Sequence, residues 1–185
     1  MSSKVYVAIF GLSGFGKSTL ARGILDSDGG GVNFNNYCVS RGGKYTFAGR
    51  YRSDRLYNGA DSISKDANKT VQKLFKSSTT PYFFSEGVRV QHFGQSFLSA
   101  FYQAQTSVII ALVADYAVSV QRIAKRSSGR ITNGNTNLER MAGRQRLLTK
   151  FESIGTKVYR IDANRDQRYV FESAMRIIRG FDELL

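Results

Sequence analysis

The chain has 185 residues, 42% of them hydrophobic, and this length and composition favour one folded domain over a disordered chain. It carries 27 Lys and Arg against 14 Asp and Glu, and the formal net charge of +13 predicts attraction to polyanions such as nucleic acid. The single cysteine, Cys38, excludes a disulfide framework and a cysteine-rich zinc site, and it favours a reducing, intracellular compartment. No apolar run approaches about 18 residues and no signal peptide is recognisable, so we expect no membrane association.

The predicted elements alternate between strands and helices along the chain. The stretch 29–36 is interpreted as a glycine-rich connection and 41–51 as a loop or hairpin. The alternation predicts the α/β class, with a parallel sheet of about five strands and helices on both faces. Apolar patterning places strands at 4–10, 37–40, 79–87, 107–115 and 157–164, and helices at 17–27, 65–78, 92–105, 116–128, 138–155 and 167–185.

The strongest motif is GLSGFGKS at residues 11–18, which matches the P-loop pattern G-x-x-x-x-G-K-[ST]. A hydrophobic strand precedes it and a helix follows, as the motif requires. Its glycines let backbone N–H groups face phosphate oxygens, and the helix N-terminus adds partial positive charge. Lys17 is expected to reach the β- and γ-phosphates as a catalytic residue, and the Ser18 hydroxyl to bind Mg²⁺. The predicted nucleotide-binding residues are Gly11, Ser13, Gly14, Phe15, Gly16, Lys17, Ser18 and Thr19.

A P-loop alone does not choose among kinases, GTPases and motors. The size and element order resemble those of small P-loop kinases of the nucleoside and nucleotide kinase type, and no N-K-x-D motif points to a GTPase. The resemblance covers essentially the whole chain. It implies one kinase domain at 1–185 with a three-layer P-loop NTPase fold, and ATP and Mg²⁺ as cofactors.

Arginines are concentrated in the segment that would form the lid of such a kinase, approximately 122–146. Arg122 and Arg126 lie four residues apart on one helix face, where they can neutralise charge on the transferred phosphoryl group. We expect both to bind ATP and act in catalysis. Arg130, Arg140 and Arg144 are further candidates, and a solvated basic face is the alternative interpretation.

Glu86 and His92 are the polar candidates near the end of the third predicted strand. A carboxylate at the carboxyl end of a strand lies in the ligand crevice of open α/β folds, so Glu86 is a candidate for holding Mg²⁺ through water. The usual residue there is aspartate, and a turn carboxylate is the alternative. His92, the only histidine, is interpreted as a substrate contact or a polar helix start rather than an acid–base catalyst.

The polar stretch GRYRSDRLYNGADSIS at 49–64 is the candidate acceptor site. A kinase that phosphorylates a hydroxyl benefits from a carboxylate that positions the nucleophile and accepts its proton. The segment after the predicted second strand, 37–40, offers no such acid. The nearest downstream carboxylates are Asp54 and Asp61, and we assign the base to Asp61 with Asp54 as the alternative.

The same stretch resembles the G-x-Y…G-T-D-R-L-S signature of phage 5-hydroxymethyluracil DNA kinases. Ser62 replaces the signature arginine, whose charge Arg52 or Arg55 would have to supply. The resemblance implies phosphorylation of the 5-hydroxymethyl group of a modified base in DNA, inside the cytoplasm of an infected bacterium. The base would be extruded from the stack and held by aromatic side chains. The matching residues are Gly49, Tyr51, Gly59, Asp61 and Ser64, and the predicted substrate contacts are Tyr51, Arg52, Asp54, Arg55, Asp61 and His92.

Two other functions stay open from the sequence. One is a kinase acting on a free nucleoside, nucleotide or polynucleotide 5′ end. The other, from a different class, is a DNA-binding protein that uses ATP as a conformational switch. The sequence does not indicate whether the protein is a monomer or an oligomer.

Overall fold

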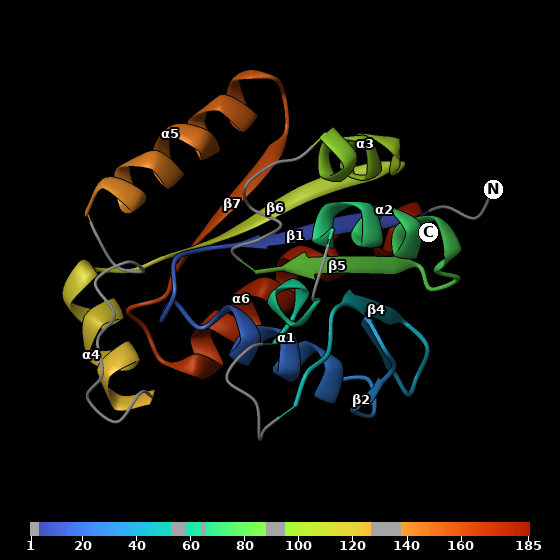
Figure 1. Ribbon diagram of the computed structural model, residues 1–185, viewed down its shortest axis with the longest axis horizontal. Helices are drawn as coiled ribbons and strands as arrows, with labels where there is room; N and C mark the ends of the chain where they lie inside the picture. The colour runs from blue at the N-terminus through green and yellow to red at the C-terminus, as the bar shows by residue number, and fades with distance from the viewer. Residues whose placement is uncertain (1–3, 53–57, 64–65, 88–94, 127–137) are drawn as a thin grey trace.

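The computed structural model describes residues 4–52, 58–63, 66–87, 95–126 and 138–185, and it gives only the backbone at 95–97, 126 and 138–140. Its centre is a seven-stranded sheet in the order β2-β3-β4-β5-β1-β6-β7 (Figure 1). The strands from β4 to β7 in this order run parallel, and β2 and β3 extend the sheet in antiparallel fashion. The bounds are β1 Val5–Phe10, β2 Gly31–Asn33, β3 Tyr37–Ser40, β4 Tyr45–Ala48, β5 Tyr82–Glu86, β6 Thr106–Val113 and β7 Lys157–Asp162.

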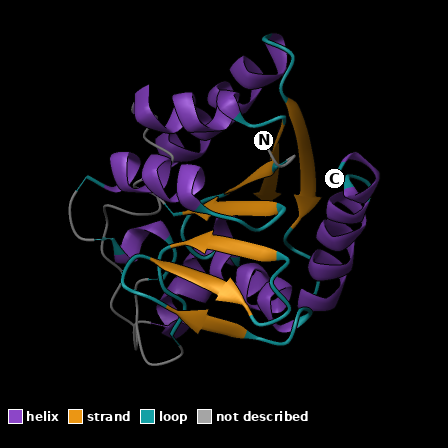
Figure 2. Cartoon of the chain, turned by 90° about the vertical axis from the view of Figure 1, so that its right-hand side faces the viewer, coloured by secondary structure: helices purple, strands orange, loops and turns teal. Residues whose placement is uncertain are grey.

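Helices cover both faces of the sheet, which confirms the three-layer P-loop NTPase fold (Figures 1 and 2). One core contains the apolar faces of α1 (Lys17–Asp26) and α6 (Gln167–Arg179). The other contains residues of α2 (Ala67–Ser77), α3 (Gln95–Gln103) and α5 (Leu138–Ser153). The remaining described helices are α4 (Tyr116–Arg126) and the 3-10 turns η1 (Ala60–Ser62) and η3 (Asp182–Leu184).

Strand β1 is buried along its whole length because it lies between β5 and β6 with helices on both sides. Its side chains alternate between the two faces, as a pleated strand requires. Val5, Val7 and Ile9 enter the core beneath α1 and α6. Tyr6 and Phe10 enter the core beneath α2, α3 and α5. This rigid central strand ends directly at the P-loop.

The second parallel strand was predicted wrongly. The segment 37–40 forms β3, but it is antiparallel to β4, and β4 is the strand that pairs parallel with β5. β4 lies within 41–51, where glycines had indicated a loop or hairpin. The hairpin is real, yet all four residues of β4 are buried and Phe47 stacks on Phe84 with ring centroids 4.4 Å apart. The sheet therefore has seven strands rather than about five, five of them parallel.

The parallel strands present their carboxyl ends at one edge of the sheet. The P-loop follows β1 there, Glu86 ends β5, and the chain after β4 continues into Gly49 and Arg50. Among the described helices, none is long and apolar enough to cross a membrane.

Candidate active site

The P-loop wraps the N-terminus of α1. Gly11, Gly14 and Gly16 all have positive φ, and Gly16 is the left-handed residue that starts the helix. A side chain at Gly14 would press on the backbone carbonyl of Ser119, so the loop packs closely against α4. Glycines with positive φ let backbone N–H groups of such a loop face phosphate oxygens at the helix N-terminus. Phe15 is buried in the core, whereas Thr19 is exposed.

Lys17 and Ser18 lie at the start of α1 and face the end of β5. Lys17 Nζ donates to the carbonyl oxygens of Gly11 (2.9 Å) and Leu12 (3.0 Å), so the ammonium group spans the loop. The Ser18 hydroxyl donates to Glu86 Oε1 at 2.9 Å. The hydroxyl and the carboxylate that were predicted to share Mg²⁺ are therefore in direct contact.

Glu86 is 2% exposed. Burial and, less strongly, the charge of Asp61 raise the pKa of its carboxyl to about 7, although Lys17 and the Ser18 hydroxyl act in the opposite direction. A buried carboxylate whose pKa is perturbed next to a P-loop is typical of a functional group rather than a turn residue. A cation beside it would favour the ionised form.

Asp61 lies in η1, and the structure brings this turn against the end of β5. An isolated bridge joins Arg50 to Gly59, which returns the chain to the sheet edge. Gly59 has φ +61° and ψ −150°, and a Cβ there would overlap Glu86 Oε1. A Cβ on Gly87 would lie 3.0 Å from Asp61 Oδ1. Gly59 and Gly87 permit these close contacts because they have no side chains. The contacts bring the carboxyl groups of Asp61 and Glu86 close to each other.

Tyr51 requires a correction. It was predicted as an aromatic face on which a base stacks, but its side chain is 7% exposed and its ring packs edge-on against Phe47 at 5.4 Å. Its buried hydroxyl lies near the Glu86 carboxylate. Burial and the charge of Glu86 raise the pKa of Tyr51, so the hydroxyl stays protonated beside the carboxylate. The ring is a core element that supports the site.

Helix α4 carries Arg122 of the predicted lid segment 122–146, and the described part of α5 carries Arg144 of the same segment. Arg122 Nη1 lies 3.5 Å from the Gly14 carbonyl oxygen, and Ser119 donates to the Ser13 carbonyl at 2.8 Å. Arg122 is therefore held beside the P-loop, and its contact with a phosphate stays a prediction. Sequence reasoning missed Ser119, whose small size permits this close packing and which carries no motif.

Several predicted residues lie outside the described part of the chain. They are Asp54, Arg55, His92, Ser64 and Arg130, together with the side chains of Arg126 and Arg140. Arg52 is described and exposed, and its backbone N–H donates to Asn58 Oδ1 at 2.7 Å. Arg50 and Arg52 lie on either side of Tyr51 in the sequence. Both arginines are exposed, whereas Tyr51 between them is buried, as alternation along an extended segment predicts.

The donor set fits Mg²⁺. This ion prefers oxygen ligands, and it is usually held by one or two carboxylates together with waters and substrate phosphates rather than by an all-protein cage. Ser18 and Glu86 provide one hydroxyl and one carboxylate in contact. The described residues contain no group of three or more His, Cys, Asp or Glu side chains of the kind that holds a metal without substrate.

The fold and the P-loop geometry define the chain as a P-loop protein with the architecture of small kinases. Comparison with solved structures agrees. Deoxyadenosine kinase from M. mycoides with bound dCTP superposes with a TM-score of 0.52 and 19% identity, over 95% of this chain and 99% of that chain. The same kinase with bound dATP gives a TM-score of 0.51 and 18% identity, over 94% and 99%. At this identity the likeness shows the fold alone. No protein-family model and no curated protein matches the sequence.

Proposed function

We propose that the protein is an ATP-dependent phosphotransferase of the nucleoside kinase type, acting on a hydroxyl acceptor. The observation that carries this proposal is the contact between Ser18 Oγ and Glu86 Oε1, because it joins the P-loop to a buried carboxylate at the crevice of the sheet. Similarity to the fold of a deoxyadenosine kinase supports a nucleoside as the acceptor class.

The residues would divide the work as follows. Backbone N–H groups of the P-loop and Lys17 bind the β- and γ-phosphates, and Arg122 stabilises charge on the transferred group. Ser18 and Glu86 hold Mg²⁺, which when bound neutralises phosphate charge. The acceptor oxygen forms a bond to the γ-phosphorus as the bond to the β–γ bridging oxygen breaks. Asp61 accepts the acceptor's proton, and ADP is the leaving group.

Asp61 rather than Asp54 is our choice for the base. Asp61 packs on Gly87, directly after Glu86, and its charge is close enough to raise the pKa of that carboxyl. The acceptor hydroxyl would then lie between Asp61 and the γ-phosphate. Gly49 and Arg50 follow β4 directly, and neither is an acid. The role of base therefore falls to Asp61 in the turn η1, which returns to this edge of the sheet.

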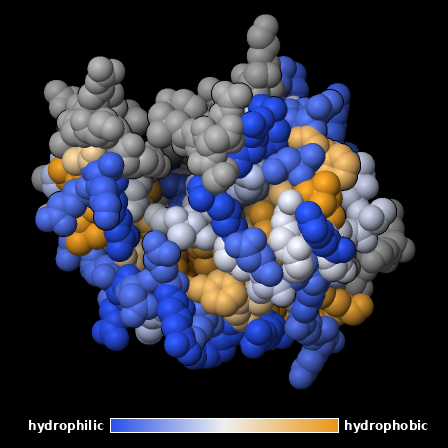
Figure 3. Space-filling model, turned by 90° about the horizontal axis from the view of Figure 1, so that it is seen from below, coloured by the Kyte–Doolittle hydropathy of each residue, from blue (hydrophilic) through white to orange (hydrophobic). Residues whose placement is uncertain are grey.

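A second acceptor has specific support in this chain: the 5-hydroxymethyl group of 5-hydroxymethyluracil in DNA. The net charge of +13 exceeds what a free nucleoside needs, since a DNA strand is held through its phosphates. Among the residues coloured by hydropathy in Figure 3, hydrophilic ones predominate, with several apolar patches between them. The Gly59–Asp61 part of the resembling segment also lies at the carboxylate site.

An acceptor panel with γ-labelled ATP tests the proposal. The panel contains free deoxynucleosides, DNA with 5-hydroxymethyluracil, DNA with thymine only, and DNA with a free 5′ hydroxyl. Label in deoxynucleosides supports the first acceptor, and label confined to the modified DNA supports the second. Label at 5′ ends would identify a polynucleotide kinase. ATP turnover with no labelled acceptor would contradict phosphotransfer and favour an ATP-driven switch.

A further inference from the structure

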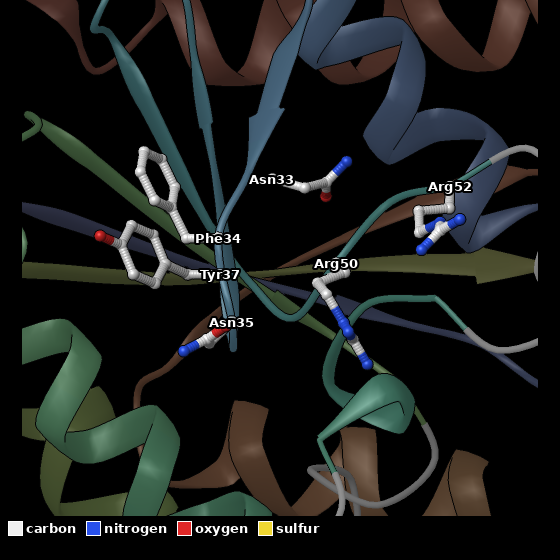
Figure 4. A pocket seen from close by; sticks show the side chains of 6 residues that line it. All are labelled: Asn33, Phe34, Asn35, Tyr37, Arg50 and Arg52. Atoms are coloured by element: carbon white, nitrogen blue, oxygen red, sulfur yellow. The ribbon is translucent and has the colours of Figure 1, made fainter.

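A pocket of about 580 Å³ lies beside the β2–β3 hairpin, which forms one end of the strand order of the sheet. Its lining combines two aromatic rings, two amides and two arginines, and no carboxylate. Figure 4 shows the six residues, which are Asn33, Phe34, Asn35, Tyr37, Arg50 and Arg52. This composition suits a ligand with a flat ring and negative charge.

The aromatic part is a preformed stack. The rings of Phe34 and Tyr37 are 4.6 Å apart and within 12° of parallel (Figure 4). Phe34 is 45% exposed, so its ring remains open to a further partner. Aromatic side chains of this kind bind unpaired bases by stacking, without regard to sequence.

The charged part lies on the segment that leads to the carboxylate site. Arg50 and Arg52 are exposed on either side of the buried Tyr51. The Arg50 guanidinium has no carboxylate partner among residues 4–52, 58–63, 66–87, 95–126 and 138–185. In Figure 4 the two arginine side chains point away from the rings, on the other side of the hairpin, where they can contact successive phosphates of a strand that passes over the pocket.

The hairpin is fixed relative to the active site. Asn33 holds the Tyr51 backbone through two hydrogen bonds, from Tyr51 N at 2.7 Å and to Tyr51 O at 2.9 Å. Gly49 N donates to Asn36 O at 2.6 Å. Tyr37, the first residue of β3, pairs with Ala48, the last residue of β4. The turn between β2 and β3 therefore lies at the carboxyl end of β4, at the same edge of the sheet as Glu86, the last residue of β5. Two strand spacings separate β3 from β5, on the order of 10 Å. About three stacked nucleotides span that distance.

We propose that this pocket binds an unpaired nucleotide of a single-stranded nucleic acid, with the base stacked on Phe34 and the phosphates on Arg50 and Arg52. The inference rests on the proposed function in one respect only, namely that the bound strand would lead toward the acceptor site. Binding to the pocket itself requires no phosphoryl transfer. Arg50 and Arg52 would contact successive phosphates, which a strand has and a free nucleoside monophosphate lacks, so the pair favours a strand.

Fluorescence anisotropy without ATP tests the proposal, using a labelled oligothymidine of about twelve nucleotides, an oligouridine of the same length and a duplex. We expect tighter binding of single strands than of the duplex. Phe34→Ala should weaken single-strand binding about tenfold, whereas Phe34→Tyr should bind as wild type. Arg50→Gln should weaken binding and lower the salt slope by about 0.7. Arg176→Gln, an exposed α6 residue, is the charge-matched control and should change little.

Three results would overturn the proposal. The first is binding by both Phe34→Ala and Arg50→Gln with wild-type affinity. The second is an equal loss of affinity with Arg176→Gln, which would indicate attraction to the overall positive charge of the protein rather than to the pocket. The third is displacement of the oligonucleotide by an equal concentration of free thymidine monophosphate. Thermal melting separates the alternative in which Phe34 only stabilises its turn, since Phe34→Ala would then lower Tm while Arg50→Gln bound normally. The acceptor panel is independent, so failure here would leave phosphotransfer unaffected.

Discussion

Ser18 donates a hydrogen bond from its hydroxyl to Glu86 Oε1 at 2.9 Å, across 68 residues of sequence. The contact connects the start of α1 with the end of β5. It places a hydroxyl and a buried carboxylate where Mg²⁺ would meet the phosphates of ATP. Four expectations depend on this crevice and its surroundings, and a fifth tests the account as a whole.

Replacing Glu86 by Gln keeps the shape and the acceptor for the Ser18 hydroxyl but removes the charge. We expect phosphoryl transfer to fall about 10²–10³-fold and the Mg²⁺ concentration for half-maximal activity to rise. A magnesium titration of initial rates measures both. Glu172→Gln is the matched control, because Glu172 is exposed on α6 and pairs with Arg168. Equal magnesium dependence in wild type and Glu86→Gln would exclude Glu86 from the metal site.

Glu86 also predicts how stability depends on pH. Burial raises its pKa from 4.5 to about 7 in the folded protein. Between these pH values the folded protein still holds a proton that the unfolded chain has released, so stability falls as pH rises. Relative to Glu86→Gln, the free energy of unfolding of the wild type should decline by on the order of 3 kcal/mol over this range. Urea unfolding in EDTA at several pH values measures it, and parallel profiles for the two proteins would refute the shift.

Gly59 holds the turn that carries Asp61 against Glu86. A Cβ at this position would overlap Glu86 Oε1, and φ +61° with ψ −150° is strained for any side chain. Gly59→Ala should therefore cost about 1–3 kcal/mol of stability and most of the activity. Gly143→Ala in α5 is the control, since a Cβ there would meet only the Arg146 guanidinium at 4.0 Å. The control should gain about 0.5–1 kcal/mol. Unchanged melting and activity in Gly59→Ala would show that the turn does not hold this position.

Asp61→Asn tests the base directly. The variant should keep ATP affinity, because Asp61 lies beyond the phosphate-binding residues, while phosphoryl transfer falls by about 10²–10⁴. Nucleotide binding by calorimetry and single-turnover transfer measure the two quantities separately. Near-normal turnover would move the assignment to Asp54.

The P-loop and the three-layer fold could be predicted from the sequence because their signals are local. A hydrophobic strand, a glycine pattern and a helix occupy residues 4–27 without interruption, and the structure has β1 and α1 there. Glu86 was recognisable for the same reason, as an acid at the end of an apolar strand. Each prediction needed only neighbouring residues and general rules of α/β folds.

What the sequence could not show depends on contacts between distant segments. β4 was hidden by flanking glycines, and its strand character comes from packing against β5. Tyr51 is indistinguishable in sequence from an exposed aromatic residue, yet Phe47 and Glu86 surround it in the fold. Asp66 stands at the N-cap position of α2, where an aspartate usually caps, yet it has φ 49° and makes no side-chain capping bond. Of the Phe34–Tyr37 stack, Phe34 lay in the segment 29–36 that was interpreted only as a connection, and Tyr37 began the strand predicted at 37–40.

The central claim is that this P-loop serves phosphoryl transfer to a hydroxyl acceptor. The most direct measurement compares wild type with Lys17→Ala in transfer of label from γ-labelled ATP to the acceptor panel. We predict labelled acceptor with the wild type, and about 10²–10⁴-fold less with Lys17→Ala, because Lys17 spans the loop where the β- and γ-phosphates would bind. ATP turnover that labels no acceptor, or transfer that survives loss of Lys17 undiminished, would contradict the account.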